Sequence, residues 1–169
     1  MTATRTSILD RKQTLQKIKR IAYEIYENNF QEEEVVLAGI YDKGYLLAQI
    51  LQRELMAIAP LRTRLVKISL EKFTPVQGGV ALDCPTEALR HRSIVVVDDV
   101  LNTGRTLMHS LKPLLEIEVK KIQIAVMVDR SHRTFPVAAG YVGYSLSTTI
   151  QEHIEVVLEE GERFGVYLS

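Results

Sequence analysis

Hydrophobic and polar positions along the chain form blocks of two kinds. Short apolar runs of strand length alternate with longer stretches in which apolar residues recur every three or four positions, the spacing of an amphipathic helix. The predicted strands are residues 35–40, 64–70, 93–99 and 121–128, and the predicted helices are 15–26, capped by Asp10, 45–59 and 106–117. Shorter strand-like pieces follow at 140–146, 153–158 and 164–169.

This alternation of strands and helices predicts an α/β fold. The run IVVV (94–97) is apolar at every position, so both faces of that strand are expected to be buried. We therefore expect an open, mostly parallel sheet flanked by helices, with a small C-terminal hood and β-pieces. No repeat, low-complexity tract or linker interrupts residues 1–169, which are expected to form a single domain.

Composition excludes some classes of protein but does not identify a binding partner. The chain has 21 basic and 21 acidic residues, so its net charge favours neither nucleic acid nor a membrane as an obligatory partner. Cys84 is the only cysteine, which leaves no internal disulfide and no cysteine cluster for zinc. The sequence also shows no signal peptide and no apolar run of membrane-spanning length, and a cytoplasmic location is expected.

The most informative stretch is DDVLNTGRT, residues 98–106, which directly follows an apolar strand. Ligands of open parallel sheets bind beyond the carboxyl ends of the strands, where Asp98 and Asp99 are expected. A loop is expected after Asp99, and then a helix that begins near Arg105 or Thr106. Unpaired amides at a helix start suit a phosphate, whereas a carboxylate accepts hydrogen bonds from a cis-diol. Together these groups predict a site for a ribose 5-phosphate.

Two other interpretations of an acidic pair at a strand end are disfavoured. A Walker B pair requires a P-loop, and in GIYDKG (39–44) the lysine precedes the second glycine, with Tyr45 and Leu46 where Lys and Ser or Thr should follow. A receiver domain carries its acidic pair after the first strand, whereas here it lies at mid-chain. A purely structural Asp-Asp pair that caps the next turn stays open as a weaker alternative.

Residues 98–106 resemble the phosphoribosyl-diphosphate loop of type I phosphoribosyltransferases, in which an apolar strand leads into two acids and a Thr-Gly-Arg/Lys-Thr turn. Residues 125–148, AVMVDRSHRTFPVAAGYVGYSLST, resemble the matching region of the pyrimidine-operon regulator family. Members of that family are bifunctional and have uracil phosphoribosyltransferase activity. The resemblance implies a type I phosphoribosyltransferase-like fold and displacement of pyrophosphate from phosphoribosyl diphosphate by a nucleobase, most simply uracil.

The resemblance also implies roles for individual residues. Asp98 and Asp99 would be catalytic, holding the ribose hydroxyls and contacting the Mg²⁺ cofactor through those hydroxyls or through water. The 5-phosphate would be held by Asn102, Thr103, Gly104, Arg105 and Thr106. The leaving pyrophosphate would meet Ile40, Tyr41, Asp42, Lys43 and Gly44. The base would lie near Asp129, Arg130 and His132.

The chain departs from the family pattern at three places. The regulator family usually has Thr-Arg where this chain has Asp42 and Lys43, so a carboxylate lies beside the expected pyrophosphate site. Purine enzymes often carry an acid just before the Thr-Gly turn, and here that position is Asn102, which takes up no proton at neutral pH. The lid expected over residues 71–83 is short and lacks a tyrosine-arginine step.

These observations leave functions of different classes open. The first is a Mg²⁺-dependent uracil phosphoribosyltransferase, and the alternative is a nucleotide-sensing regulator of pyrimidine genes that binds RNA. The basic face that RNA requires would be built from one of two sets of residues: Arg11, Lys12, Lys17, Lys19 and Arg20, or Arg90, Arg92, Arg130 and Arg133. Lys12, Gln16, Lys19 and Tyr23 would align on one side of the first helix, a pattern that an ordinary solvated helix also shows. A third reading is a catalytically inactive paralogue used for assembly, which the short lid and Asp42 favour. A homo-oligomer, most simply a dimer, is also expected.

Overall fold

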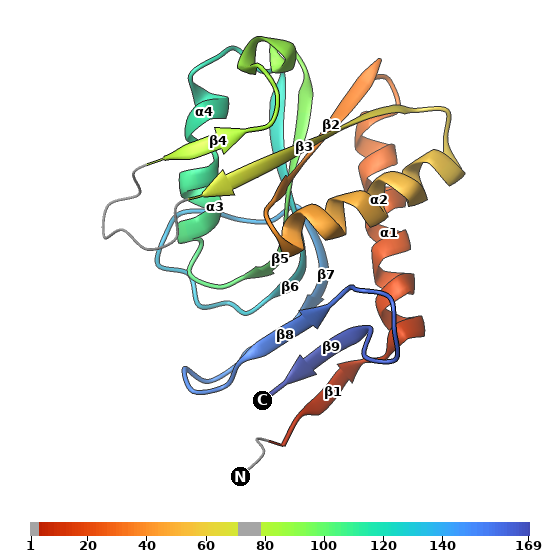
Figure 1. Ribbon diagram of the computed structural model, residues 1–169, viewed down its shortest axis with the longest axis vertical. Coiled ribbons are helices and arrows are strands. Elements are labelled where there is room, and N and C mark those ends of the chain that lie inside the picture. Colours follow the sequence, from red (N-terminus) through yellow and green to blue (C-terminus); the bar gives the residue numbers. More distant parts are fainter. Residues whose placement is uncertain (1–3, 71–78) are drawn as a thin grey trace.

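The computed structural model describes residues 4–70 and 79–169 and contains two β-sheets (Figure 1). The larger sheet is six-stranded, in the order β4-β3-β2-β5-β6-β7, and only β4 runs antiparallel to its neighbour. Its strands are β2 Glu34–Ile40, β3 Arg62–Leu70, β4 Val80–Leu82, β5 Ser93–Leu101, β6 Lys121–Asp129 and β7 Tyr141–Ser145. The predicted mostly parallel α/β sheet is confirmed.

Helices cover both faces of this sheet. Helices α1, Arg11–Asn29, and α2, Lys43–Ile58, pack on one face, while the short α3, Arg105–Ser110, and α4, Lys112–Leu115, lie on the other. A 3₁₀ turn, Thr86–Leu89, precedes β5. In β2, Val35 and Leu37 belong to the hydrophobic core that includes α1 and α2, and Val36 and Ala38 belong to the core that includes α3 and α4. Because side chains alternate along a strand, a sheet covered on both faces needs the continuous apolar runs seen in the sequence.

A separate three-stranded antiparallel sheet, in the order β1-β9-β8, lies beside both chain termini (Figure 1). It consists of β1 Thr6–Leu9, β8 Ile154–Val157 and β9 Gly165–Leu168. The sequence predicted β8 and β9 but not β1. That strand has only Ile8 and Leu9 as apolar residues, which is too short a pattern to show a period of two.

The first two helices begin close to where the sequence predicts. Asp10 caps α1: its carboxylate accepts a hydrogen bond from the amide of Gln13 (2.8 Å), and the Gln13 side chain accepts one from the amide of Asp10 (3.0 Å). The second helix starts at Lys43, two positions before the expected residue 45. The lid expected at 71–83 lies mostly outside the described residues, and Val80–Leu82 of it form β4.

Two sequence-based expectations are wrong. The helix expected at 106–117 is divided into α3 and α4, because Pro113 has no N–H and its ring would meet the carbonyl of His109 in a continuous helix. The loop expected directly after Asp99 begins later, because β5 continues to Leu101. Asp98 therefore pairs in the ladder with Val126 of β6, and Leu101 pairs with Asp129.

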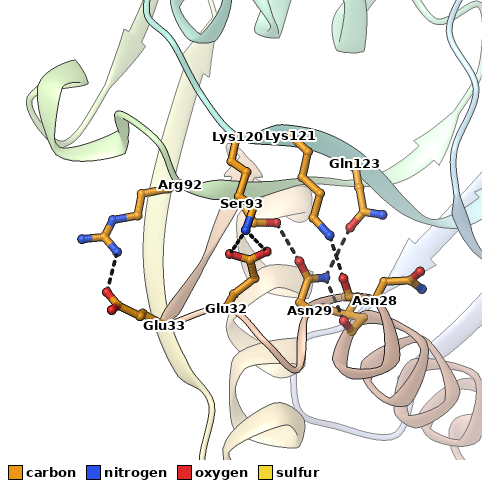
Figure 2. A network of polar contacts seen from close by, with 10 residues as sticks. Asn28, Asn29, Glu32, Glu33, Arg92, Ser93, Lys120, Lys121 and Gln123 are labelled. Carbon is orange, nitrogen blue, oxygen red and sulfur yellow. Dashed lines mark hydrogen bonds and ion pairs between the residues drawn. The ribbon is translucent and has the colours of Figure 1, made fainter.

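A buried polar network joins the end of α1 to the starts of β5 and β6 (Figure 2). The side chain of Asn29, 1% exposed, donates to the carbonyl of Ile25 (2.8 Å) and to Oε1 of Gln123 (3.3 Å). Its Oδ1 accepts from the hydroxyl of Ser93 (2.6 Å), and the Tyr141 hydroxyl donates to Gln123 (2.8 Å). Burial raises the pKa of Tyr141. Nothing in the sequence pattern predicts this network, which lies at the opposite ends of the strands from Asp98.

Replacing Asn29 by leucine is expected to lower the free energy of unfolding by about 2–4 kcal/mol, because the buried Ser93 hydroxyl and the Gln123 amide oxygen lose a partner. Urea denaturation measures the loss. Glu33→Ala is the matched control, since Glu33 is 91% exposed and contacts Arg92 at 3.8 Å on the surface of the same region. A change within about 0.5 kcal/mol for both variants would show that the network contributes little.

Within residues 4–70 and 79–169, no helix is both long enough and apolar enough to span a lipid bilayer.

Candidate phosphoribosyl site

The two acids of the motif lie at the carboxyl end of β5 but have different surroundings. Asp98 is 8% exposed, and its Oδ1 accepts a hydrogen bond from the amide of Asp99 (2.9 Å). Asp99 is half-buried. Successive side chains of a strand point to opposite faces, so the two carboxylates leave β5 in different directions.

The turn after β5 has the backbone that the sequence predicts. Gly104 precedes the first residue of α3 and has a φ of 88°, a left-handed conformation that a side chain disfavours. The hydroxyl of Thr103 accepts a hydrogen bond from the amide of Arg105 (3.3 Å). The carbonyl of Thr103 in turn accepts from the amides of Thr134 (2.9 Å) and Phe135 (3.0 Å). The turn is therefore held by the segment that follows β6.

A hollow of about 230 Å³, counted with adjoining solvent, lies over this turn. It is lined by Asp98, Val100, Leu101, Asn102, Thr103, Gly104, Arg105, Thr106 and Leu107. The structure thus brings Asp98 together with all five residues predicted to hold a phosphate. Asp99 is not among the residues that line the hollow.

The segment 40–44 lies directly against Asp98 through Gly44. Strand β2 ends at Ile40, Tyr41 and Asp42 are exposed, and α2 begins at Lys43. A Cβ placed on Gly44 would be 2.5 Å from the carbonyl oxygen of Val97 and 2.9 Å from Cα of Asp98. Only glycine therefore allows the start of α2 to approach β5 this closely, and the predicted pyrophosphate loop is brought beside the predicted ribose site.

Strand β6 brings the predicted base residues to the same edge of the sheet. Asp129, 6% exposed, lies opposite Leu101. Its carboxylate accepts a hydrogen bond from the amide of Ser131 (2.9 Å) and forms an ion pair with Arg133. Nε2 of His132 contacts the carbonyl oxygen of Thr148. The predicted residues of β2, β5 and β6 thus meet at the carboxyl ends of three adjacent strands.

Arg130, the third predicted base residue, has every nitrogen of its guanidinium group bonded to the protein itself. Nε donates to the hydroxyl of Thr148 (2.9 Å), and Nη1 donates to Oδ1 of Asn102 (3.0 Å). Nη2 donates to the carbonyls of Thr149 (3.2 Å) and Glu152 (2.6 Å). Sequence reasoning did not find Thr148, Thr149 or Glu152, which lie in a polar segment without a motif.

Lys67 of β3 is a second group that sequence reasoning missed. Its ammonium group lies 5.3 Å from the ring centre of Tyr41 and 5.0 Å from that of Tyr45, which is a cation–π arrangement beside the 40–44 segment. An isolated lysine in a strand carries no sequence signal for such a position.

The carboxylates of the site could bind a magnesium ion only if substrate phosphates and water supplied its other ligands. The residues described contain no group of three or more His, Cys, Asp or Glu side chains that could hold a metal by themselves. Mg²⁺ commonly binds through one or two carboxylates with substrate phosphates and water completing its shell. Asp98 and Asp99, adjacent to a phosphate-type turn, fit that mode of binding.

The chain is similar to known proteins over most of its length. The phosphoribosyl transferase domain model matches residues 4–160. The bifunctional protein PyrR of Macrococcus caseolyticus is 35% identical over 96% of this chain and 97% of its own length. PyrR of Clostridioides difficile is 36% identical over 92% of each chain.

Solved structures resemble the fold as well. A hypoxanthine-guanine phosphoribosyltransferase from Bacillus anthracis superposes with a TM-score of 0.75 at 19% identity, covering 96% of both chains. The hypoxanthine phosphoribosyltransferase of Trypanosoma cruzi, in complex with its product IMP, superposes with a TM-score of 0.72 at 18% identity, covering 83% of this chain and 79% of the other. At such identities the likeness concerns the fold alone.

Proposed function

We propose that this chain, which belongs to the phosphoribosyl transferase domain family, transfers the 5-phosphoribosyl group of phosphoribosyl diphosphate to uracil and releases pyrophosphate. The observation that carries the proposal is the hollow that joins Asp98 to the turn of residues 102–106. It offers the Asp98 carboxylate as an acceptor for a diol at one end, and amide and hydroxyl donors for a phosphate at the other.

The proposed roles follow the positions of the side chains. Asp98 and Asp99 accept hydrogen bonds from the ribose hydroxyls, and the amides and hydroxyls of the turn hold the 5-phosphate. The pyrophosphate lies against residues 40–44, where the amides of the loop and the Lys43 ammonium supply positive charge. The base lies near Asp129 and His132, with Arg130 beside them.

The reaction is a displacement at C1 of the ribose. A bond forms from a ring nitrogen of the base to C1, and that nitrogen loses its proton to water. The bond from C1 to the pyrophosphate oxygen breaks, and its electron pair leaves with the pyrophosphate. Catalysis depends mostly on holding the two reactants in line and on stabilising the charge that leaves. A magnesium ion held by phosphate oxygens and by Asp98 and Asp99, through ribose hydroxyls or water, would supply further positive charge there.

Asn102 supports a pyrimidine as the acceptor base. Purine enzymes of the superfamily that this chain resembles often carry an acid at that position, whereas an amide takes up no proton at neutral pH. We therefore expect uracil to react faster than hypoxanthine when pyrophosphate release from phosphoribosyl diphosphate is followed with Mg²⁺ present. Chelation of Mg²⁺ should abolish turnover. Faster turnover of hypoxanthine than of uracil would contradict the proposed substrate.

A graded loss of ligand affinity is expected when the phosphate turn is altered. Thr106→Ala removes one hydroxyl and should weaken UMP binding by about 1–3 kcal/mol, the range for a hydrogen bond to a charged group. Gly104→Val should cost more, because a β-branched residue is strained at a φ of 88°. Calorimetry with UMP gives the order, and uracil alone should show a much smaller loss. Equal UMP affinities in all three proteins would mean that the turn only begins a helix.

A second function, RNA binding, is favoured by the surface of α1. Lys12, Gln16, Lys19 and Tyr23 lie at helical spacing and are all exposed. Two cations, an amide and an aromatic ring on one helix face suit a nucleic-acid backbone and an unstacked base. Filter binding of a uridine-rich RNA to the wild-type protein and to Lys12→Gln/Lys19→Gln tests this role, and identical weak binding by both would exclude it.

A further inference from the structure

Arg130 joins three segments that are distant in sequence. It lies just after β6, and its side chain reaches Asn102 in the phosphate turn and Thr148, Thr149 and Glu152 before β8. Its own amide also donates to the carbonyl of Leu101 (3.1 Å), the last residue of β5. Every nitrogen of the guanidinium group is thus bonded to the protein.

The bond to Asn102 fixes which way that amide faces. A guanidinium group has N–H donors and no acceptor, so the oxygen of Asn102 must point toward Arg130 and the NH₂ group must point away. Asn102 is otherwise exposed in the turn, and an exposed amide would rotate freely. Arg130 therefore converts an adaptable side chain of the site into one with a fixed direction.

Residues 148–152, which the Arg130 side chain contacts, are also held by hydrogen bonds among themselves. The amide of Thr149 donates to the Glu152 carboxylate (2.6 Å), which holds the pKa of Glu152 below its usual range, and the Glu152 amide donates to the Thr149 hydroxyl (3.3 Å). His132 contacts the Thr148 carbonyl beside them. This segment leads directly into β8 of the three-stranded sheet. Arg130 thus connects the phosphate turn to the small sheet.

We propose that Arg130 is a positioning residue that orients the Asn102 amide and clamps the phosphate turn to residues 148–152. The inference rests on the proposed function, because it concerns how that site is held. A lysine cannot replace it, because the three donors of an ammonium group share one nitrogen, whereas the four acceptors here are bonded by the separate Nε, Nη1 and Nη2 atoms of the guanidinium fork. The consequence is that Arg130 and Asn102 act on ligand binding as one unit.

A double-mutant cycle with Arg130→Met, Asn102→Ala and the double variant tests this unit, with UMP affinity from calorimetry and steady-state kinetics as readouts. Each single change should weaken UMP binding about tenfold, and the double variant should be no weaker than the poorer single variant within about twofold. The KM for phosphoribosyl diphosphate should rise similarly while kcat changes less. Arg130→Lys should restore only a minor part of the affinity.

Arg163→Met is the matched control. Arg163 lies before β9 and contacts Glu155 at 3.6 Å with its side chain 61% exposed, so the same chemical change is made in an arginine of the small sheet that does not reach the turn. This variant should bind UMP as the wild type does. Should Arg130→Met fail to fold by circular dichroism, the cycle is run with Arg130→Lys and judged by the same criterion.

The outcomes separate this inference from the proposed function. A wild-type protein that binds neither UMP nor phosphoribosyl diphosphate would overturn the proposed function. A wild-type protein that binds, combined with losses that multiply to about a hundredfold in the double variant, would overturn the Arg130–Asn102 unit alone. Wild-type affinity in Arg130→Met would do the same.

Discussion

Gly44→Ala is expected to reduce transferase activity by on the order of a hundredfold or more. Its Cβ would lie 2.5 Å from the Val97 carbonyl oxygen and 2.9 Å from Cα of Asp98, and both are backbone atoms that cannot rotate away. The start of α2 must therefore move off β5 and carry residues 40–44 with it. A displacement near 1 Å at a site that works by positioning costs about that factor.

The same substitution should also destabilise the protein, although alanine is the better helix former. The gain in helix propensity is at most about 1 kcal/mol, whereas overpacking against backbone costs roughly 1–3 kcal/mol. Gly140→Ala is the matched control, because no atom lies within 4 Å of the Cβ it would add. Urea denaturation and the pyrophosphate assay on both variants give the comparison. Full activity in Gly44→Ala would mean that this close approach does not position the pyrophosphate loop.

Asp99→Asn is expected to weaken binding of a 5-phosphoribosyl ligand by about 10²- to 10³-fold, because hydrogen bonds to a carboxylate contribute roughly 1.5–3 kcal/mol each. Asp98→Asn should weaken binding at least as much, since Asp98 lines the hollow over the turn. The two variants should differ in stability. Asp99 is half-buried, and its substitution should leave the free energy of unfolding within about 1 kcal/mol.

Calorimetry with UMP and urea denaturation of both variants separate the two effects. Asp98 is 8% exposed and lies against Gly44, so Asp98→Asn should lower stability as well as affinity. If Asp99→Asn lowered the free energy of unfolding by well over about 1 kcal/mol but kept the UMP affinity of the wild type, the acidic pair would be structural.

The sequence predicts the large sheet because each buried strand carries its own signal. The run IVVV at residues 94–97 is apolar at every position, and together with the alternation of strands and helices it indicates a parallel sheet covered on both faces. The positive φ of Gly104 is likewise predictable, because a glycine directly before an expected helix start is free to adopt that conformation. The predicted family is confirmed by the match of residues 4–160.

Features that depend on long-range contacts are not predictable in this way. Arg130 was expected beside the base, yet its donors bond to Asn102 and to the 148–152 segment, which no local pattern connects to it. Asn29 and Ser93 are polar residues whose burial follows only from their pairing across the fold. The break in the helix at Leu111, by contrast, was predictable, because Pro113 cannot continue a helix. One helix was expected instead because apolar residues keep a helical spacing throughout 106–117.

We propose that residues 98–106 form a phosphoribosyl site, and equilibrium dialysis with radiolabelled phosphoribosyl diphosphate and Mg²⁺ tests this claim most directly. We expect saturable binding at one site per chain, displaced by UMP but not by uridine, which lacks the phosphate. Gly104→Val should lose most of this binding, while Arg163→Met should keep it. Absence of saturable binding, or equal displacement by UMP and uridine, would contradict the claim.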